Sequence, residues 1–170
     1  NVVIYFYPKD NTPGCTTEGQ DFRDRMKQFE ELDTVILGVS RDGLKAHENF
    51  RAKHEFPFHL ISDKDEALCT LFDVIKLKKL YGKEYMGVDR STFLIDKDGV
   101  LRAEWRGVKV KGHADEVLAS VVAFIESSRD DFVLVGMPGE PFVEIGLAVK
   151  ALSRAGHTMF AGYCYGVLAF

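Results

Sequence analysis

The sequence predicts an α/β fold in which a mixed β-sheet is flanked by helices, followed by an extra C-terminal strand-helix segment. Three observations predict this fold. Strand-like apolar runs alternate with helical patterns over the first half of the chain. A hairpin signal then indicates two antiparallel strands, and an amphipathic pattern after the hairpin predicts a helix that packs on the sheet.

The first elements are a buried strand and the helix that follows it. Residues 2–7 form a continuous run of Val, Ile, Tyr and Phe, which is typical of a strand buried on both faces. Residues 8–14 are rich in Pro, Asp, Asn and Gly and predict a loop. Apolar side chains then recur at helical spacing, at Phe22, Met26 and Phe29. Cys15 is therefore expected at a junction between loop and helix.

The remaining elements continue this alternation. Strands are expected at 34–40 and 58–61, and helices at 44–53 and 66–72. Strands at 91–95 and 100–105 flank Lys97-Asp98-Gly99, a hairpin signal. A helix at 113–126, with one apolar stripe, completes the domain. Parallel strands with crossover helices, followed by a hairpin and a packing helix, predict a thioredoxin-like mixed sheet.

A polar break at 127–131 separates this domain from the rest of the chain. Beyond it the pattern predicts a strand at 132–135, a helix at 142–152 and an aromatic, Gly-rich end at 159–170. We therefore expect one domain at 1–128 and an extra segment at 129–170.

Composition limits the partners and the compartment. The 22 Lys and Arg against 26 Asp and Glu give a net charge of −4 without a basic run, which argues against nucleic acid as a partner. Charged residues interrupt every apolar stretch before about 20 residues, so no membrane span is expected. Cys15, Cys69 and Cys164 do not form a secreted disulfide pattern, and no signal peptide is visible. These features favour a cytoplasmic protein. Separately, we expect a monomer or dimer.

Cys15 is the candidate nucleophile. A cysteine attacks as the thiolate, which unpaired backbone N–H groups stabilise in the first turn of a helix. Thr12 lies in the same loop, where its hydroxyl could reach the sulfur or an incoming oxygen, and Pro8 would form a rigid wall. Arg90, just before a predicted strand, could stabilise the thiolate and the charge that develops on a leaving oxygen.

The segment at 5–18, Tyr-Phe-Tyr-Pro-Lys-Asp-Asn-Thr-Pro-Gly-Cys-Thr-Thr-Glu, resembles the active-site signature of peroxiredoxins of the bacterioferritin comigratory protein or Q type. The resemblance continues at 21–23, 38–40, 60–63, 90–96 and 110–113, and so covers residues 1 to about 128. It implies that Cys15 is the peroxidatic cysteine, with Pro8, Thr12 and Arg90 as its companions. It also implies antioxidant reduction of hydrogen peroxide and organic hydroperoxides through a Cys15 sulfenic acid, without a metal or organic cofactor.

The resemblance leaves two routes for resolving the sulfenic acid. Many members of the family carry a second cysteine five residues after the first, where this chain has Gln20. The reductant is then expected to be an external thiol, namely thioredoxin, glutaredoxin or glutathione. Cys69 is the internal alternative, although its apolar helix also predicts an inert core thiol. Family members usually begin with further strands, so the domain is expected to lack its first strands.

The C-terminal segment has a separate resemblance. Residues 138–148, Pro-Gly-Glu-Pro-Phe-Val-Glu-Ile-Gly-Leu-Ala, are similar to a segment of neutral or alkaline ceramidase-like proteins, in which the Glu that corresponds to Glu140 binds zinc with His residues from elsewhere. Those His segments are absent from this sequence. We therefore expect a fusion or a gene-call junction near residue 129, and no zinc at Glu140.

The sequence does not favour several other functions. A disulfide exchanger needs a Cys-x-x-Cys pair, but Thr16, Thr17 and Glu18 follow Cys15. The spacing of Gly14 and Gly19 matches a phosphate loop, yet the required Lys is missing. His47, His54 and His59 lack the spacing of a zinc site and are expected at the surface. The alternative that stays open is a non-catalytic or poorly folded fragment of a peroxidase.

Overall fold

The computed structural model describes residues 1–80, 82–128, 132–136 and 157–161. The chain divides into two compact units, residues 1–122 and 123–170, and each is described by itself. The division falls inside the helix α5 (His113–Ser128).

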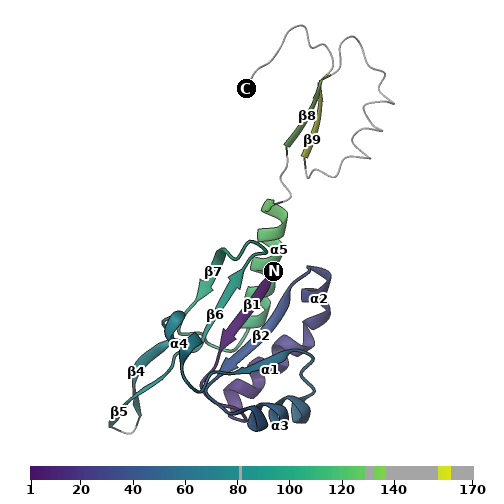
Figure 1. Ribbon diagram of the computed structural model, residues 1–170. Coiled ribbons are helices and arrows are strands. Elements are labelled where there is room, and N and C mark those ends of the chain that lie inside the picture. The colour runs from purple at the N-terminus through teal and green to yellow at the C-terminus, as the bar shows by residue number, and fades with distance from the viewer. Residues whose placement is uncertain (81, 129–131, 137–156, 162–170) are drawn as a thin grey trace. The chain divides into compact units, whose positions relative to one another are not determined.

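The first unit is built on a five-stranded mixed sheet (Figure 1). Its strand order is β3-β2-β1-β6-β7, with β1 parallel to β2, β2 parallel to β3, and antiparallel pairing of β1 with β6 and of β6 with β7. The strands are β1 (Val2–Phe6), β2 (Val35–Ser40), β3 (His59–Ser62), β6 (Ser91–Ile95) and β7 (Leu101–Trp105). The predicted mixed sheet is confirmed, and β1 is its central strand.

Within the residues that the structure describes, four helices precede α5. They are α1 (Pro13–Asp24), α2 (Met26–Glu31), α3 (Leu44–His54) and α4 (Ala67–Leu71). The sequence predicts continuous helical spacing through Phe29, but the structure has a break between α1 and α2. At Arg25 the backbone has φ −106° and ψ 2°, outside the helical region, so the apolar spacing continues across two separate helices.

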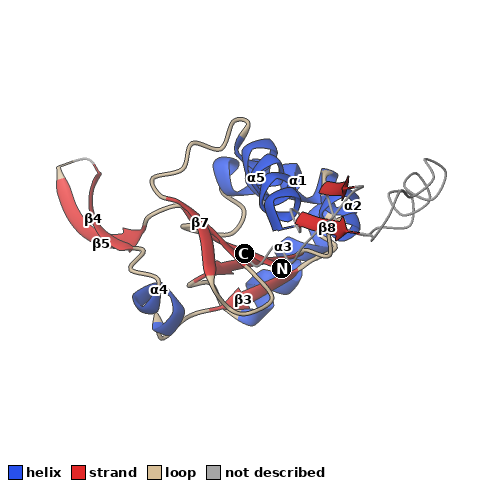
Figure 2. Cartoon of the chain, turned by 90° about the horizontal axis from the view of Figure 1, so that it is seen from above, coloured by secondary structure: helices blue, strands red, loops and turns tan. Residues whose placement is uncertain are grey.

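The two faces of β1 are covered by different helices. Tyr5 and Tyr7 point to one face, where Tyr5 stacks on Phe22 of α1 at 4.9 Å and Tyr7 contacts Phe50 of α3 at 6.2 Å between ring centroids. Phe6 points to the other face. Its ring lies 5.1 Å from Phe72, beside α4. Figure 2 shows α1 and α5 on one side of the sheet and α4 on the other.

A separate two-stranded ribbon, β4 (Ile75–Leu80) and β5 (Lys83–Val88), is not among the predicted elements. It extends away from the sheet (Figure 2). Leu77 and Met86 are paired across it and both are more than half exposed. Because the ribbon is largely exposed to solvent, its sequence lacks the continuous apolar run that identifies a buried strand.

In the second unit, β8 (Phe132–Gly136) pairs in parallel with β9 (His157–Ala161). The strand predicted at 132–135 is confirmed, and β9 overlaps the start of the predicted aromatic end. The predicted helix at 142–152, Glu140 and Cys164 lie outside the described residues. Within the described ranges, no helix is long and apolar enough to cross a membrane.

Candidate active site

Cys15 lies in the first turn of α1, on the face of the helix that is turned toward the protein, with 2% of its surface exposed. Pro13 opens the helix, where its missing N–H costs nothing and its fixed φ suits the helix. Gly14 and Cys15 follow, and backbone N–H groups at these positions have no carbonyl partner within a helix. The site therefore combines a sulfur atom with positive backbone dipoles.

Arg90 lies directly beside this sulfur. Its Nη2 atom donates to Cys15 Sγ at 3.2 Å, although the two residues are 75 positions apart. Arg90 lies in the short connection between β5 and β6. Its backbone is held by a hydrogen bond of 2.9 Å from Val108 N to the Arg90 carbonyl oxygen. Burial lowers the pKa of Arg90, but the charges of Glu18 and Cys15 outweigh it and raise the pKa, so the guanidinium stays charged.

Glu18 is a residue of the site to which the sequence analysis assigned no role. Its Oε2 atom accepts a hydrogen bond from Arg90 Nη1, and its side chain is 2% exposed. Burial raises the pKa of Glu18 to about 7, although the charge of Arg90 lowers it. Spacing could have found this residue, because positions i and i+3 of a helix, here Cys15 and Glu18, share one face.

Thr12 and Pro8 belong to the loop between β1 and α1. Thr12 is the N-cap of α1, yet its hydroxyl does not cap the helix, since it donates to the carbonyl oxygen of Lys9 at 3.0 Å. Pro8 is exposed. Between them, Asn11 adopts φ 57°, a left-handed conformation that Asn tolerates better than most residues, and this lets the chain turn into the helix.

Cys69 has the opposite environment to Cys15. It belongs to α4 and is fully buried in the core cluster formed by Ile4, Phe6, Val39, Val74, Val88 and Phe93. Burial, together with the hydrogen bond and charge of Asp63, raises the pKa of the Cys69 thiol to about 12. The expected position of Cys69 in the core is thus confirmed.

The prediction that His47 is a surface residue is wrong. His47 is 3% exposed and its Nδ1 atom lies 2.9 Å from Asp10 Oδ2. Periodicity did not reveal this because α3 is mostly polar and the burial of His47 depends on partners far away in the sequence. Among the described residues, no group of three His, Cys, Asp or Glu side chains could hold a metal ion.

The comparisons with known proteins agree on one family. The sequence model of the AhpC/TSA family matches residues 1–104. Peroxiredoxin Bcp of Xanthomonas campestris pv. campestris is 58% identical over 122 residues, which cover 72% of this chain and 76% of the relative. Peroxiredoxin Bcp of Bacillus subtilis is also 58% identical, over 120 residues, which cover 71% of this chain and 76% of the relative.

A solved structure supports the same assignment. The bacterioferritin comigratory protein of Xanthomonas campestris superposes with a TM-score of 0.70 at 57% identity, and the match covers 72% of this chain and 78% of that protein. The family model, over residues 1–104, includes the Cys15 site and the strands β1 to β6. The chain therefore belongs to the AhpC/TSA family and is a thiol peroxidase of the Bcp type.

Proposed function

We propose that Cys15 is the residue that reduces the peroxide, with Arg90, Thr12 and Pro8 as its companions. The contact of 3.2 Å between Arg90 Nη2 and Cys15 Sγ carries this proposal, because a fixed cation beside a sulfur favours the thiolate. The same guanidinium can also stabilise negative charge that develops on the leaving oxygen.

The reaction then follows from the groups present. The thiolate sulfur of Cys15 attacks one peroxide oxygen, the O–O bond breaks, and the second oxygen leaves as water or an alcohol after it takes up a proton. Cys15 becomes a sulfenic acid. The hydroxyl of Thr12 donates its hydrogen bond to the carbonyl oxygen of Lys9. Its oxygen can therefore accept a hydrogen bond from the O–H group of a bound hydroperoxide.

An external thiol completes the cycle in this proposal. It condenses with the sulfenic acid to release water and form a mixed disulfide, which a second thiol reduces. Thioredoxin, glutaredoxin and glutathione are the candidate reductants. Support comes from Cys69, which is buried against the sheet face opposite to that covered by α1, so its thiol is poorly placed to take this role.

The substrates and the setting complete the proposal. The solved structure of the Xanthomonas campestris relative concerns alkyl peroxide reduction by that protein, which supports organic hydroperoxides as substrates here, beside hydrogen peroxide. A reduced thiol is needed for every turnover, which favours the reducing cytoplasm as the compartment. A monomer or a dimer is the oligomeric state in this proposal.

The experiment is peroxide consumption with dithiothreitol as the reductant, compared among the unmodified chain, Cys15→Ser and Cys69→Ser. Cys15→Ser should abolish turnover while it still unfolds cooperatively, because Ser cannot supply a soft anion at neutral pH. Cys69→Ser is the matched control, and a folded Cys69→Ser protein should keep the activity. Turnover that persists in Cys15→Ser would remove Cys15 from the mechanism.

A further inference from the structure

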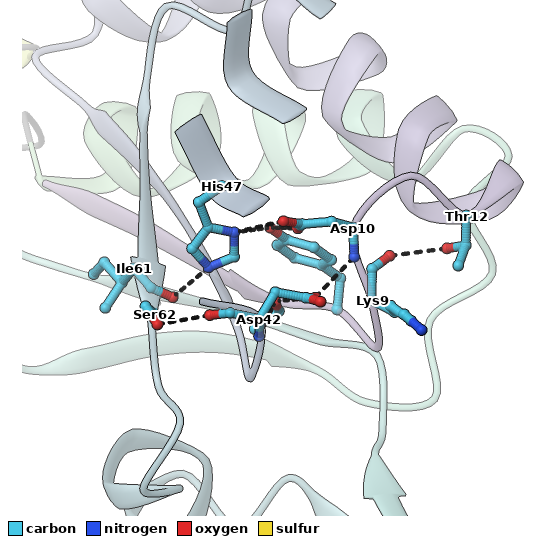
Figure 3. A network of polar contacts seen from close by, with 9 residues as sticks. Lys9, Asp10, Thr12, Asp42, His47, Ile61 and Ser62 are labelled. Atoms are coloured by element: carbon cyan, nitrogen blue, oxygen red, sulfur yellow. Dashed lines mark hydrogen bonds and ion pairs between the residues drawn. The ribbon is translucent and has the colours of Figure 1, made fainter. Parts of the chain in front are cut away.

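The loop that carries Thr12 rests on a buried polar network that the peroxide chemistry does not use directly (Figure 3). Asp10, only 7% exposed, is at its centre. Its Oδ1 atom accepts a hydrogen bond from the hydroxyl of Tyr7 at 2.7 Å, and its Oδ2 atom lies 2.9 Å from Nδ1 of His47 on α3. The loop is therefore tied to a helix 37 positions further along the chain.

Both ring nitrogens of His47 lie beside hydrogen-bond acceptors. Nδ1 faces the carboxylate of Asp10, and Nε2 lies 3.2 Å from the carbonyl oxygen of Ile61 in β3. Acceptors on both sides of the ring are best satisfied when both ring nitrogens carry a proton, so this arrangement favours the imidazolium form. Burial lowers the pKa of His47, but the hydrogen bond and charge of Asp10 outweigh it and the pKa is raised. Asp10 and His47 thus form a close buried contact, which is an ion pair when His47 is protonated.

The same network holds the peptide unit between Lys9 and Asp10 from two sides. The N–H of Asp10 donates to Oδ2 of Asp42 at 2.9 Å. The carbonyl oxygen of Lys9 accepts the hydroxyl proton of Thr12 at 3.0 Å. A peptide unit is planar and rigid, so the orientation of its N–H also sets the direction of its carbonyl.

Asp42 is itself fixed by two serines. Its Oδ2 atom accepts a hydrogen bond from Ser40 Oγ at 2.8 Å, and its carbonyl oxygen accepts one from Ser62 Oγ at 2.6 Å. Ser40 ends β2 and Ser62 ends β3. The loop after β1 is therefore fastened to the ends of the two neighbouring parallel strands.

We infer that Asp10 and His47 are positioning residues of the peroxidase, which fix the Lys9–Asp10 peptide and thereby aim the hydroxyl of Thr12 at the bound peroxide. The inference rests on the role proposed above for Thr12 and adds residues that touch neither the sulfur nor the substrate. A tilt of this peptide would move the carbonyl to which Thr12 donates. A misplacement of about 1 Å can slow an oriented reaction by about a hundredfold.

The test compares Asp10→Ala with Asp10→Asn. Alanine removes both side-chain contacts of Asp10. Asparagine is the conservative variant, since its amide oxygen can accept from Tyr7 while its NH₂ group donates to a neutral His47, whose Nε2 still donates to Ile61. The control is Asp96→Ala, since Asp96 is also 7% exposed but holds the β6–β7 turn through Arg102 and backbone N–H groups.

Two rates are measured for each variant, together with a thermal melt. The first is the second-order rate of the reduced enzyme with peroxide, and the second is the rate at which iodoacetamide alkylates Cys15. Alkylation needs the thiolate but not Thr12. Asp10→Ala should lower the peroxide rate by about tenfold to a hundredfold and leave alkylation within about twofold, because only the aim of Thr12 is lost. Asp10→Asn should recover most of the peroxide rate, and Asp96→Ala should keep both rates.

A folded Asp10→Ala protein that reacts with peroxide at the unmodified rate would overturn the inference, and so would peroxide and alkylation rates that fall together. If Asp10→Ala does not melt cooperatively, Asp42→Ala frees the same peptide from its other side and must show the same selective loss. The Cys15→Ser variant distinguishes failure of the proposed function from failure of the positioning role alone. Activity that persists without Cys15 refutes the proposed function, whereas an inactive Cys15→Ser beside a fully active Asp10→Ala refutes only the positioning role.

Discussion

Arg90 links the two acidic partners of the site. One nitrogen of its guanidinium donates to the sulfur of Cys15 and another to the carboxylate of Glu18. The rigid fork of an arginine can make both contacts at once, which a lysine ammonium does with less geometric control. Glu18 therefore orients the cation, and Arg90 supplies the charge beside the sulfur.

The first prediction concerns Arg90. Arg90→Met should slow the reaction with peroxide on the order of a hundredfold, because it removes the fixed positive charge that stabilises the thiolate and the leaving oxygen. Stopped-flow measurement of the second-order rate checks this, with Arg90→Lys as the control that keeps a charge. An Arg90→Met rate equal to that of the unmodified enzyme would exclude Arg90 from the mechanism.

The second prediction concerns the contribution of Glu18 to the pH dependence of the free energy of unfolding. Its pKa of about 7 in the folded protein lies above the value of about 4.3 in an unfolded chain. The folded state thus holds the proton more tightly, and this contribution to stability is complete below about pH 4 and is lost as the pH rises through about 7. Glu18→Gln cannot ionise, so the loss should be smaller by an amount on the order of 3 kcal/mol.

Thermal melts of both proteins at pH 5 and pH 8 measure this difference. The melting temperature of the unmodified protein should fall more between the two pH values than that of Glu18→Gln. Parallel curves would mean that Glu18 ionises in the folded protein as readily as in the unfolded chain.

The residues that carry the chemistry of the site were predictable from the sequence, whereas the buried residues that hold its loop in place were not. Cys15 and Arg90 were predicted together because the motif around them is specific, and the structure places them in contact. Asp10 and His47 were missed because the burial of a polar side chain depends on tertiary contacts. In the sequence, Asp10 is one of several polar loop residues, and His47 is a lone histidine on a polar helix.

At the level of elements, the sheet separates the two described cysteines. The helix α1 covers the face to which Tyr5 points, whereas Cys69 in α4 packs in the cluster with Ile4 and Phe6 on the opposite face. A disulfide needs Cα atoms within about 7 Å, so a Cys15–Cys69 bond would require α1 or α4 to unwind.

The third prediction follows from this separation. In the native protein at pH 8, iodoacetamide should modify Cys15 but not Cys69, because Cys69 is buried and its pKa is raised to about 12. After denaturation, the remaining thiols are alkylated with a second, distinguishable reagent. Peptide mapping then shows which cysteine reacted in the native protein. Modification of native Cys69 at a rate similar to that of Cys15 would show that α4 opens readily.

The elements themselves were predictable where burial is strong. The run at 2–7 gave the central strand β1, whose residues Val3, Tyr5 and Phe6 are almost fully buried. The ribbon of β4 and β5 was missed because its alternation of Ile75 and Leu77 with lysines is short and solvated. The break at Arg25 has no sequence signal, since neither Gly nor Pro marks it.

For the whole molecule, the residues of the site and their supports all lie in the unit of residues 1–122. The fourth prediction is that truncation after Ser128 keeps the rate with peroxide within about twofold, because α5 ends there and its buried residues, from His113 to Val121, lie within that unit. Peroxide consumption and a thermal melt of the truncated chain check this. Loss of both activity and cooperative unfolding would show that the C-terminal segment supports the domain.

The central claim is that peroxide oxidises Cys15. The most direct measurement treats the reduced protein with one equivalent of peroxide, without a reductant, and locates the added oxygen by mass spectrometry of peptides. We expect a sulfenic acid, or a more oxidised sulfur, on Cys15 and an unmodified thiol on Cys69. An unmodified Cys15, or a quantitative Cys15–Cys69 disulfide, would contradict it.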